Sequence, residues 1–405
     1  MVSQTKLLLI ACSGEETTKL TQDISTTLRE DYGLEGQVEV LLAQRRVEVD
    51  KDIQKAHRHP LVGDYFPDAE VQVDIGANEL KDTLRGKHVV LVEHLLTPCR
   101  KITPEDPQCV SVNDHVMTVR GFLDVISNVE TLQRTLVAPY LAYVRSHSVE
   151  KYRKKGFFQF DSLRKMLVDF QRDGLNAILT IDPHSEKAAQ LAEELGMDYH
   201  ASNPFQSARA INPYKLRLSG GNAGKVLSRL RPFHERFAHL KEQNPNHLYV
   251  VSVDDGTEHR TENFVERAFP RLSAEDVYRL IVYFGKDRFS YGNTATDIKP
   301  FNQHTIDLEG IYITTDDMVA SAATAKKAAK TLKEQGVKRV EGWMSHAVTM
   351  PTQHAAANDH QYLDAVVCLD TVPQHPNLKV EFIAASAHLL AAELYKAHHR
   401  LVASR

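Results

Sequence analysis

The chain has 405 residues, of which 42% are hydrophobic and 25% are charged, and its formal net charge is −4. These values are ordinary for a globular protein, and the length is enough for two or three domains. The small negative charge provides no basic surface field, so we expect no nucleic acid partner. No apolar run reaches the ~18 residues that a membrane-spanning helix needs, so we expect no membrane partner. The four cysteines lack CxxC spacing, which argues against a zinc site and is typical of a reducing cytoplasm.

The first half of the chain alternates between short apolar strands and amphipathic helices. The N-terminal run predicts a strand and a turn, not a signal peptide. Residues 34–65 are rich in charge and histidine, and two charged strands with a loop are expected there. We expect Asn113 or Asp114 to cap the helix that they open. The other strands are expected at 6–11, 70–75, 88–92, 135–139 and 177–181, and helices at 18–30, 112–128, 160–171 and 185–195.

Residues 203–246 break this alternation with several prolines and many basic side chains. We therefore place a domain boundary near their start, which divides the chain into domains at 1–204 and 205–405. A last helix with Ser386 as its predicted N-cap is expected to pack back on the N-terminal domain. Strands are predicted at 247–253, 277–284, 311–313, 340–346, 365–369 and 379–383.

Strands that alternate with helices predict the α/β class, with two similar doubly wound domains and mainly parallel sheets. In such open sheets, ligands bind outside the carboxyl ends of the strands. Polar residues follow many of the predicted strands here, and helix capping alone would not place them after so many. These residues are Asp182 and His184, Asp254 and Gly256, Lys286 and Arg288, and Asp316 and Asp317.

The stretch 310–340 is the centre of this pattern. A short apolar strand is followed by Asp316 and Asp317, by small residues at 320–324, and by a helix that Gly336 is expected to end. Backbone N–H groups at the start of a helix suit an anion. The two acids suit sugar hydroxyls or a hydrated Mg²⁺. An ordinary strand-to-helix loop whose acids cap the helix has the same pattern, so both interpretations stay open.

Several segments carry a resemblance to a known family. They are Phe66-Pro67-Asp68-Ala69-Glu70, Pro139-Tyr140-Leu141-Ala142-Tyr143-Val144-Arg145, Thr180-Ile181-Asp182-Pro183-His184, Val250 to Thr257, Gly285 to Arg288, and Asp316 to Thr324. In this order and spacing the chain resembles the ribose-phosphate pyrophosphokinases (PRPP synthetases), which have the phosphoribosyltransferase fold. Ser345-His346-Ala347 and Asp370-Thr371-Val372-Pro373 stand where that family has T-H-G and D-T-I-P.

The resemblance implies an ATP site. Phe66, Asp68 and Glu70 would contact the adenine from a neighbouring subunit, and Arg145 would meet the phosphates. His184 would lie beside the phosphates and Mg²⁺. The family's Gln-Asp-Arg triplet after this arginine is replaced here by Ser-His-Ser, so part of the ATP contacts must differ.

The resemblance also implies the catalytic and metal residues. Lys286 and Arg288 would neutralise the charge that develops during diphosphoryl transfer, with His184 as the third catalytic group. Asp254 and Gly256 would belong to the pyrophosphate loop. The residues implied as Mg²⁺ ligands are His184, Asp182 and Asp254.

For ribose 5-phosphate, the resemblance assigns the ribose hydroxyls to Asp316 and Asp317. The 5-phosphate would lie in the loop that contains Ser321, Ala323 and Thr324. This loop differs from the family pattern, because Ala320 replaces its third aspartate and Ala323 replaces its glycine.

The implied function is Mg²⁺-dependent transfer of a diphosphoryl group from ATP to ribose 5-phosphate, which yields PRPP and AMP. The implied protein is a cytoplasmic homo-oligomer, either a dimer or a hexamer. One alternative is a non-catalytic homologue that associates with an active synthetase. The other alternative is a related enzyme with another acceptor sugar, or a phosphoribosyltransferase. The 66–73 segment argues against a phosphoribosyltransferase.

Overall fold

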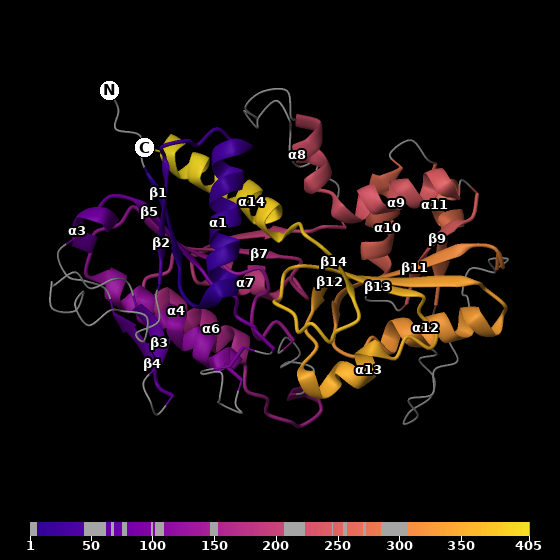
Figure 1. The fold of residues 1–405 in the computed structure, drawn as a ribbon. Coiled ribbons are helices and arrows are strands. Elements are labelled where there is room, and N and C mark those ends of the chain that lie inside the picture. Colours follow the sequence, from indigo (N-terminus) through magenta and orange to yellow (C-terminus); the bar gives the residue numbers. More distant parts are fainter. Residues whose placement is uncertain are drawn as a thin grey trace.

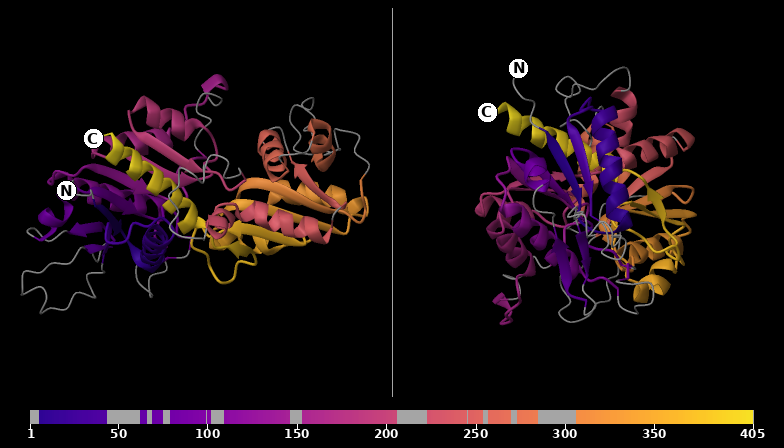
Figure 2. Two further views of the ribbon diagram at one scale, coloured as in Figure 1. Left: turned by 90° about the horizontal axis from the view of Figure 1, so that it is seen from above. Right: turned by 60° about the vertical axis from the view of Figure 1, so that its left-hand side comes forward.

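Two parallel sheets with helices on both faces form the two lobes of the chain (Figures 1 and 2). This computed structural model describes residues 6–43, 62–65, 69–74, 79–98, 100–101, 109–145, 153–205, 223–244, 246–253, 257–269, 273–284 and 306–404. The prediction of an α/β protein with two similar doubly wound sheets is confirmed. The predicted boundary between 204 and 205 falls between the two sheets and stays a prediction.

The first sheet has six strands in the order β2-β1-β5-β6-β7-β8. Every residue of β1 and β5 is buried, because helices cover both faces of a parallel sheet. The strands are β1 (Leu7–Ala11), β2 (Val38–Leu42), β5 (His88–Val92), β6 (Gln133–Val137), β7 (Ala177–Ile181) and β8 (Asp198–Ser202). The helices are α1 (Gly14–Glu30), α3 (Glu79–Leu84), α4 (Val112–Ser127), α6 (Ser162–Arg172) and α7 (Lys187–Glu194).

An antiparallel hairpin of β3 (Val62–Tyr65) and β4 (Val71–Asp74) lies apart from both sheets. The hairpin packs on α4, and Gly121 of α4 leaves room for it. A Cβ at Gly121 would lie 2.8 Å from the Val73 side chain, so only glycine allows this close approach.

The second sheet has six strands in the order β10-β9-β11-β12-β13-β14. Both sheets share one topology, in which the strand that comes first in the chain lies between the second and the third. The strands are β9 (Leu248–Ser252), β10 (Ile281–Tyr283), β11 (Ile311–Val319), β12 (Arg339–Ala347), β13 (Ala365–Leu369) and β14 (Glu381–Ile383). The helices are α8 (Ala223–Arg229), α9 (Pro232–Gln243), α10 (Glu258–Ala268), α11 (Ala274–Leu280), α12 (Ala323–Glu334), the 3₁₀ turn Pro351–Gln353 and α13 (His354–Asn358).

Helix α14 (Ser386–Ala403) leaves the second sheet and lies along α1 of the first lobe (Figure 2). The rings of Tyr32 and Tyr395 are 4.8 Å apart. His88 and His398 are both buried, with 3.1 Å between their Nδ1 atoms. The helix thus contributes to the core of the first lobe.

Several predicted boundaries are wrong, and local hydrogen bonds explain them. The strand expected at 277–284 is helix α11 as far as Leu280 and strand only from Ile281, because Ser273 caps the helix by accepting from the Asp276 N–H at 3.1 Å. Ser111, not Asn113 or Asp114, caps α4, while Asp114 closes the capping box. Ser386 lies inside α14.

The start of α14 is capped by Asp370 instead. Its Oδ1 accepts hydrogen bonds from the backbone N–H groups of Ala385 and Ser386, both at 2.9 Å, and from the Ser386 hydroxyl at 2.7 Å. The predicted stop of α12 is confirmed, since Gly336 follows it with φ 98°.

The strand expected at 311–313 is much longer. β11 continues to Val319, because Asp316 pairs with Met344 and Met318 with His346 of β12. Asp316 and Asp317 therefore belong to the strand and not to the loop after it. Helix α12 begins at Ala323 after Ala322, so the interpretation that these acids cap it is wrong.

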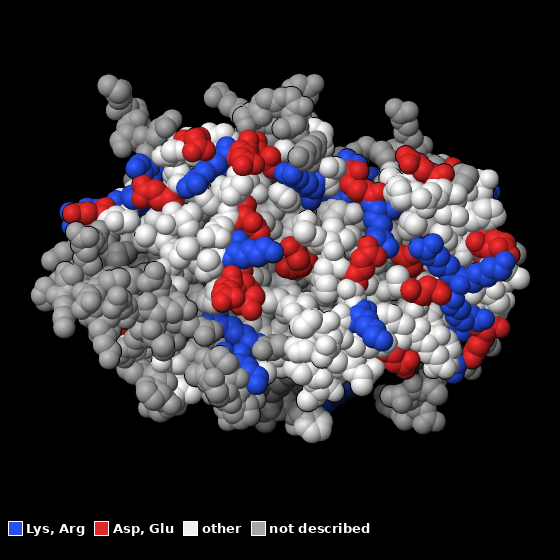
Figure 3. All heavy atoms as spheres, viewed as in Figure 1, with Lys and Arg blue, Asp and Glu red and all other residues white. Residues whose placement is uncertain are grey.

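Within the described part of the chain, none of the helices combines the length and apolarity needed to cross a membrane. On the face shown in Figure 3, acidic and basic side chains are interspersed.

Candidate functional site

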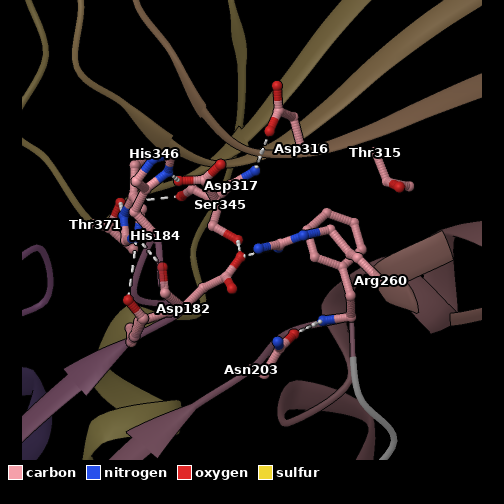
Figure 4. A network of polar contacts seen from close by, with 12 residues as sticks. Asp182, His184, Asn203, Arg260, Thr315, Asp316, Asp317, Ser345, His346 and Thr371 are labelled. Carbon is pink, nitrogen blue, oxygen red and sulfur yellow. Dashed lines mark hydrogen bonds and ion pairs between the residues drawn. The ribbon is translucent and has the colours of Figure 1, made fainter. Parts of the chain in front are cut away.

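The carboxyl ends of the two sheets meet at a cluster of polar side chains (Figure 4). Asp182 and His184 lie in the turn after β7 of the first sheet, and Asp316 and Asp317 lie on β11 of the second. His184 Nδ1 is 2.8 Å from Asp317 Oδ2. The structure thus brings together four of the residues that the sequence singled out.

The two acids of β11 have opposite protonation behaviour. Burial, together with the neighbouring Asp317 carboxylate, raises the pKa of Asp316 to about 8. Burial also opposes ionisation of Asp317, but hydrogen bonds from His184 and Asp316 hold the pKa of Asp317 well below its usual range. At neutral pH the pair therefore carries one charge, which lies on Asp317 beside His184.

His184 responds to this charge. Its hydrogen bond to Asp317 raises the pKa of His184 above the ordinary value, although burial and the nearby Arg145 oppose the shift. Nδ1 therefore donates to the ionised Asp317. Arg145 is exposed two residues after Tyr143, whose φ is 60°, and its charge acts on the same cluster.

Asp182 is the most deeply buried acid of the cluster, at 1% exposure. Its Oδ2 accepts hydrogen bonds from the Arg260 guanidinium of α10 and from the Ser345 hydroxyl of β12. Both donors belong to the second lobe, so Asp182 joins the two lobes.

The loop expected to hold a phosphate lies between β11 and α12. Ser321 and Thr324 are half-buried and Ala323 is exposed. Ala322 has φ 57°, which turns the chain sharply into the helix. Since an alanine side chain has no acceptor atom, it leaves the first N–H groups of α12 without a side-chain cap. Such N–H groups suit an anion.

Two of the three predicted Mg²⁺ ligands, Asp182 and His184, lie in the described part of the chain, and Asp254 does not. Among the described residues there is no group of three or more His, Cys, Asp or Glu side chains placed to hold a metal ion. Asp182 faces the positive charge of Arg260, and His184 is engaged by Asp317. A dication beside Asp182 would be repelled by that guanidinium.

Other predicted site residues fall outside this cluster. Glu70 is exposed and precedes β4 of the hairpin on α4. The residues Phe66, Asp68, Asp254, Gly256, Lys286 and Arg288 lie outside the described part of the chain.

The structure adds residues that the sequence did not single out for the site, namely Arg260, Ser345, His346 and Thr371. The sequence did contain an indication of Ser345 and His346, since they stand where the family has T-H-G. For Arg260, the only indication in the sequence was its place in the first turn of the helix after the predicted pyrophosphate loop.

Taken together, the paired parallel sheets and the polar cluster between their carboxyl ends define an α/β protein with two similar doubly wound sheets. The chain is similar to a crystal structure of phosphoribosylpyrophosphate synthetase from Mycobacterium smegmatis, with a TM-score of 0.62 and 16% identity over 98% of this chain and 100% of that one. At this identity the likeness establishes the fold.

Sequence relatives agree with it. The chain is 27% identical over 318 residues to a ribose-phosphate pyrophosphokinase of Pasteurella multocida, which covers 78% of this chain and 79% of that protein. It is also 24% identical over 345 residues to a ribose-phosphate pyrophosphokinase of Prochlorococcus marinus. That match covers 84% of this chain and 83% of the relative. No family model matches the chain. The resemblance seen in the sequence is thus confirmed over most of its length.

Proposed function

We propose that this chain is a ribose-phosphate diphosphokinase. The 1-hydroxyl of ribose 5-phosphate attacks the β-phosphorus of ATP, a new O–P bond forms, the bond to the α-phosphate oxygen breaks, and AMP and a proton leave. The observation that carries the proposal is the contact of His184 with Asp317 between the two sheets. Relatives named ribose-phosphate pyrophosphokinase support it, with similarity along most of the chain.

The acceptor sugar is assigned to the second lobe. Asp316 and Asp317 would accept hydrogen bonds from ribose hydroxyls. Ser321, Ala323 and Thr324 would surround the 5-phosphate at the start of α12, where uncapped N–H groups favour an anion.

The ATP side is assigned to the first lobe. His184 and Arg145 would approach the phosphates, and Phe66, Asp68 and Glu70 would come from a neighbouring subunit of a dimer or hexamer. Lys286 and Arg288 would neutralise charge in the transition state, and Asp254 and Gly256 would contact the diphosphate. These last assignments rest on the sequence resemblance.

Magnesium is assigned to the substrate. Mg²⁺ keeps most of its water and commonly binds through substrate phosphates with one or two carboxylates. We therefore propose that it arrives as the MgATP complex, since Asp182 is engaged by Arg260. A cytoplasmic location likewise stays a prediction.

The test is to incubate the purified chain with ATP, MgCl₂ and ribose 5-phosphate and to follow AMP and PRPP by ³¹P NMR. We expect both products in equal amounts, and their loss in His184→Ala. His239→Ala is the matched control, because His239 is exposed on α9. Absence of AMP and PRPP above the His184→Ala background would disprove the proposal.

The comparisons do not favour a non-catalytic homologue. If the chain were inactive alone but restored or bound an added active synthetase, that alternative would replace the proposal. Consumption of PRPP with a nucleobase and without ATP would instead indicate a phosphoribosyltransferase.

A further inference from the structure

The turn that carries His184 has a strained backbone. Asp182 adopts φ 36°, in the region that residues other than glycine avoid. Such a conformation is unfavourable by itself and persists only where the surroundings hold it. Neighbouring groups must therefore hold this turn.

The carboxylate of Asp182 is held by two donors of the second lobe, Arg260 and Ser345. The Arg260 guanidinium is itself fixed, since its Cζ lies 5.4 Å from the centre of the Phe205 ring. A charge-assisted hydrogen bond in a buried site is stronger than one between neutral groups. These two donors set the direction of the Asp182 side chain.

The backbone of the same turn is held by His346 of β12. Its Nε2 is 3.1 Å from the carbonyl oxygens of both Ile181 and Asp182. Since a carbonyl oxygen can only accept, Nε2 must carry a proton. On the other side of the ring, Nδ1 is 2.8 Å from the Thr371 hydroxyl, which fixes the ring plane.

These contacts surround the peptide units that precede His184. The ring of Pro183 fixes its own φ, and Pro183 is the only residue between Asp182 and His184. The orientation of Asp182 therefore also sets the direction of the His184 imidazole. Figure 4 shows Arg260, Ser345, His346 and Asp317 grouped around the turn that carries Asp182 and His184. The direction of His184 is thus determined largely by the lobe that carries its partner.

We propose that Arg260, Ser345 and His346 are positioning residues, which hold the Asp182–His184 turn so that His184 is aligned with Asp317 and the reacting phosphates. This role rests on the proposed diphosphoryl transfer. It differs from simple attachment of the two lobes, which would affect stability and leave the turnover of folded protein unchanged.

The experiment compares two buried serines that each donate to an aspartate. Ser345→Ala removes the donor to Asp182, and Ser386→Ala removes the 2.7 Å donor to Asp370 at the start of α14. We expect Ser345→Ala to lower kcat about tenfold, the effect of one hydrogen bond, with both KM values nearly unchanged. Ser345→Thr keeps the hydroxyl and should restore the rate, and Ser386→Ala should leave kcat unchanged.

A second readout needs no turnover. In protein labelled with ¹⁵N-histidine, the ring resonances of His184 should shift in Ser345→Ala and His346→Gln, and stay unchanged in Ser386→Ala. Equal effects of the two serine variants on kcat and on the His184 resonances would overturn the positioning role. If the wild type makes no PRPP, the proposed function fails, and the resonances still decide whether these residues position His184.

Discussion

The acid that follows β5 of the first sheet and the acids on β11 of the second occupy equivalent places, since each strand is the third of its sheet along the chain. Glu93, after β5, is fully buried. Its Oε1 accepts from Ser13 at 2.7 Å and lies 2.6 Å from His115 Nδ1. Asp317, on β11, contacts His184 of the other lobe.

The difference lies in where the partners come from. Glu93 Oε1 takes both of its partners from its own lobe, and Arg100 donates to Ser13 there at 2.8 Å, so the chain itself closes this edge. Asp317 is satisfied across the junction of two lobes, at a half-exposed histidine. One topology therefore gives a structural network at one edge and a candidate active site at the other.

The largest effect should come from Glu93→Ala. It leaves Ser13 and His115 buried without their acceptor, and we expect the free energy of unfolding to fall by about 3–5 kcal/mol. Urea denaturation measures this loss, with Glu93→Gln, which keeps an acceptor oxygen, as the milder control. If Glu93→Ala folds with wild-type stability and loses only activity, the structural role assigned to the β5 edge is wrong.

A smaller loss, now of activity, is expected from Asp317→Asn. Without the charge beside His184, kcat should fall about 100-fold, as for the removal of one electrostatic group from an active site. Steady-state assays of AMP release measure it. Asp364→Asn, which alters an acid at the start of β13 that accepts from Val340 N, should turn over normally. A wild-type rate for Asp317→Asn would remove the functional contrast between the edges.

Ser13→Ala sharpens the contrast at the closed edge. Because the hydroxyl donates to Glu93 and accepts from Arg100, we expect a loss of about 1 kcal/mol in unfolding free energy. Turnover by the folded protein should not change. A selective rise in the KM for ATP or ribose 5-phosphate would show that this edge takes part in binding.

The smallest change in rate is expected from Asp316→Asn at pH 7. The pKa of Asp316 is raised to about 8, so its carboxyl is protonated there and an amide resembles it. Because the folded pKa exceeds the unfolded one, the native state binds more protons between them, and this group's contribution to stability falls as pH rises toward 8. Asp316→Asn should flatten that fall in unfolding measured at pH 5 and 8, and a steeper fall would contradict the assignment.

Much of the fold could be predicted because its signals are local. The apolar run His88–Val92 indicates a buried strand, and Gly336 marks the end of α12. The acid pair of β11 and His184 could be recognised because they follow predicted strands. The longer-range features could not. The pairing of β11 with β12 determines where β11 ends, and the sequence near Asp316 does not show it.

Arg260 and Glu93 illustrate the same limit for the site. Arg260 reaches Asp182 only because α10 and β7 come together across the lobes. Glu93 looks like any other strand-end acid, and its partner His115 lies on a helix further along the chain. The sequence therefore indicates which residue types are available, while tertiary packing decides which edge is closed.

Helix α14 has a consequence for the order of synthesis. Leu389, Leu390 and Tyr395 share one apolar core with Leu20 and Ile24 of α1. At roughly 5–20 residues per second, a ribosome needs on the order of tens of seconds between the two helices. Until α14 emerges, the nascent first lobe leaves that face of α1 uncovered, so it is a ready substrate for chaperones that bind apolar segments during translation.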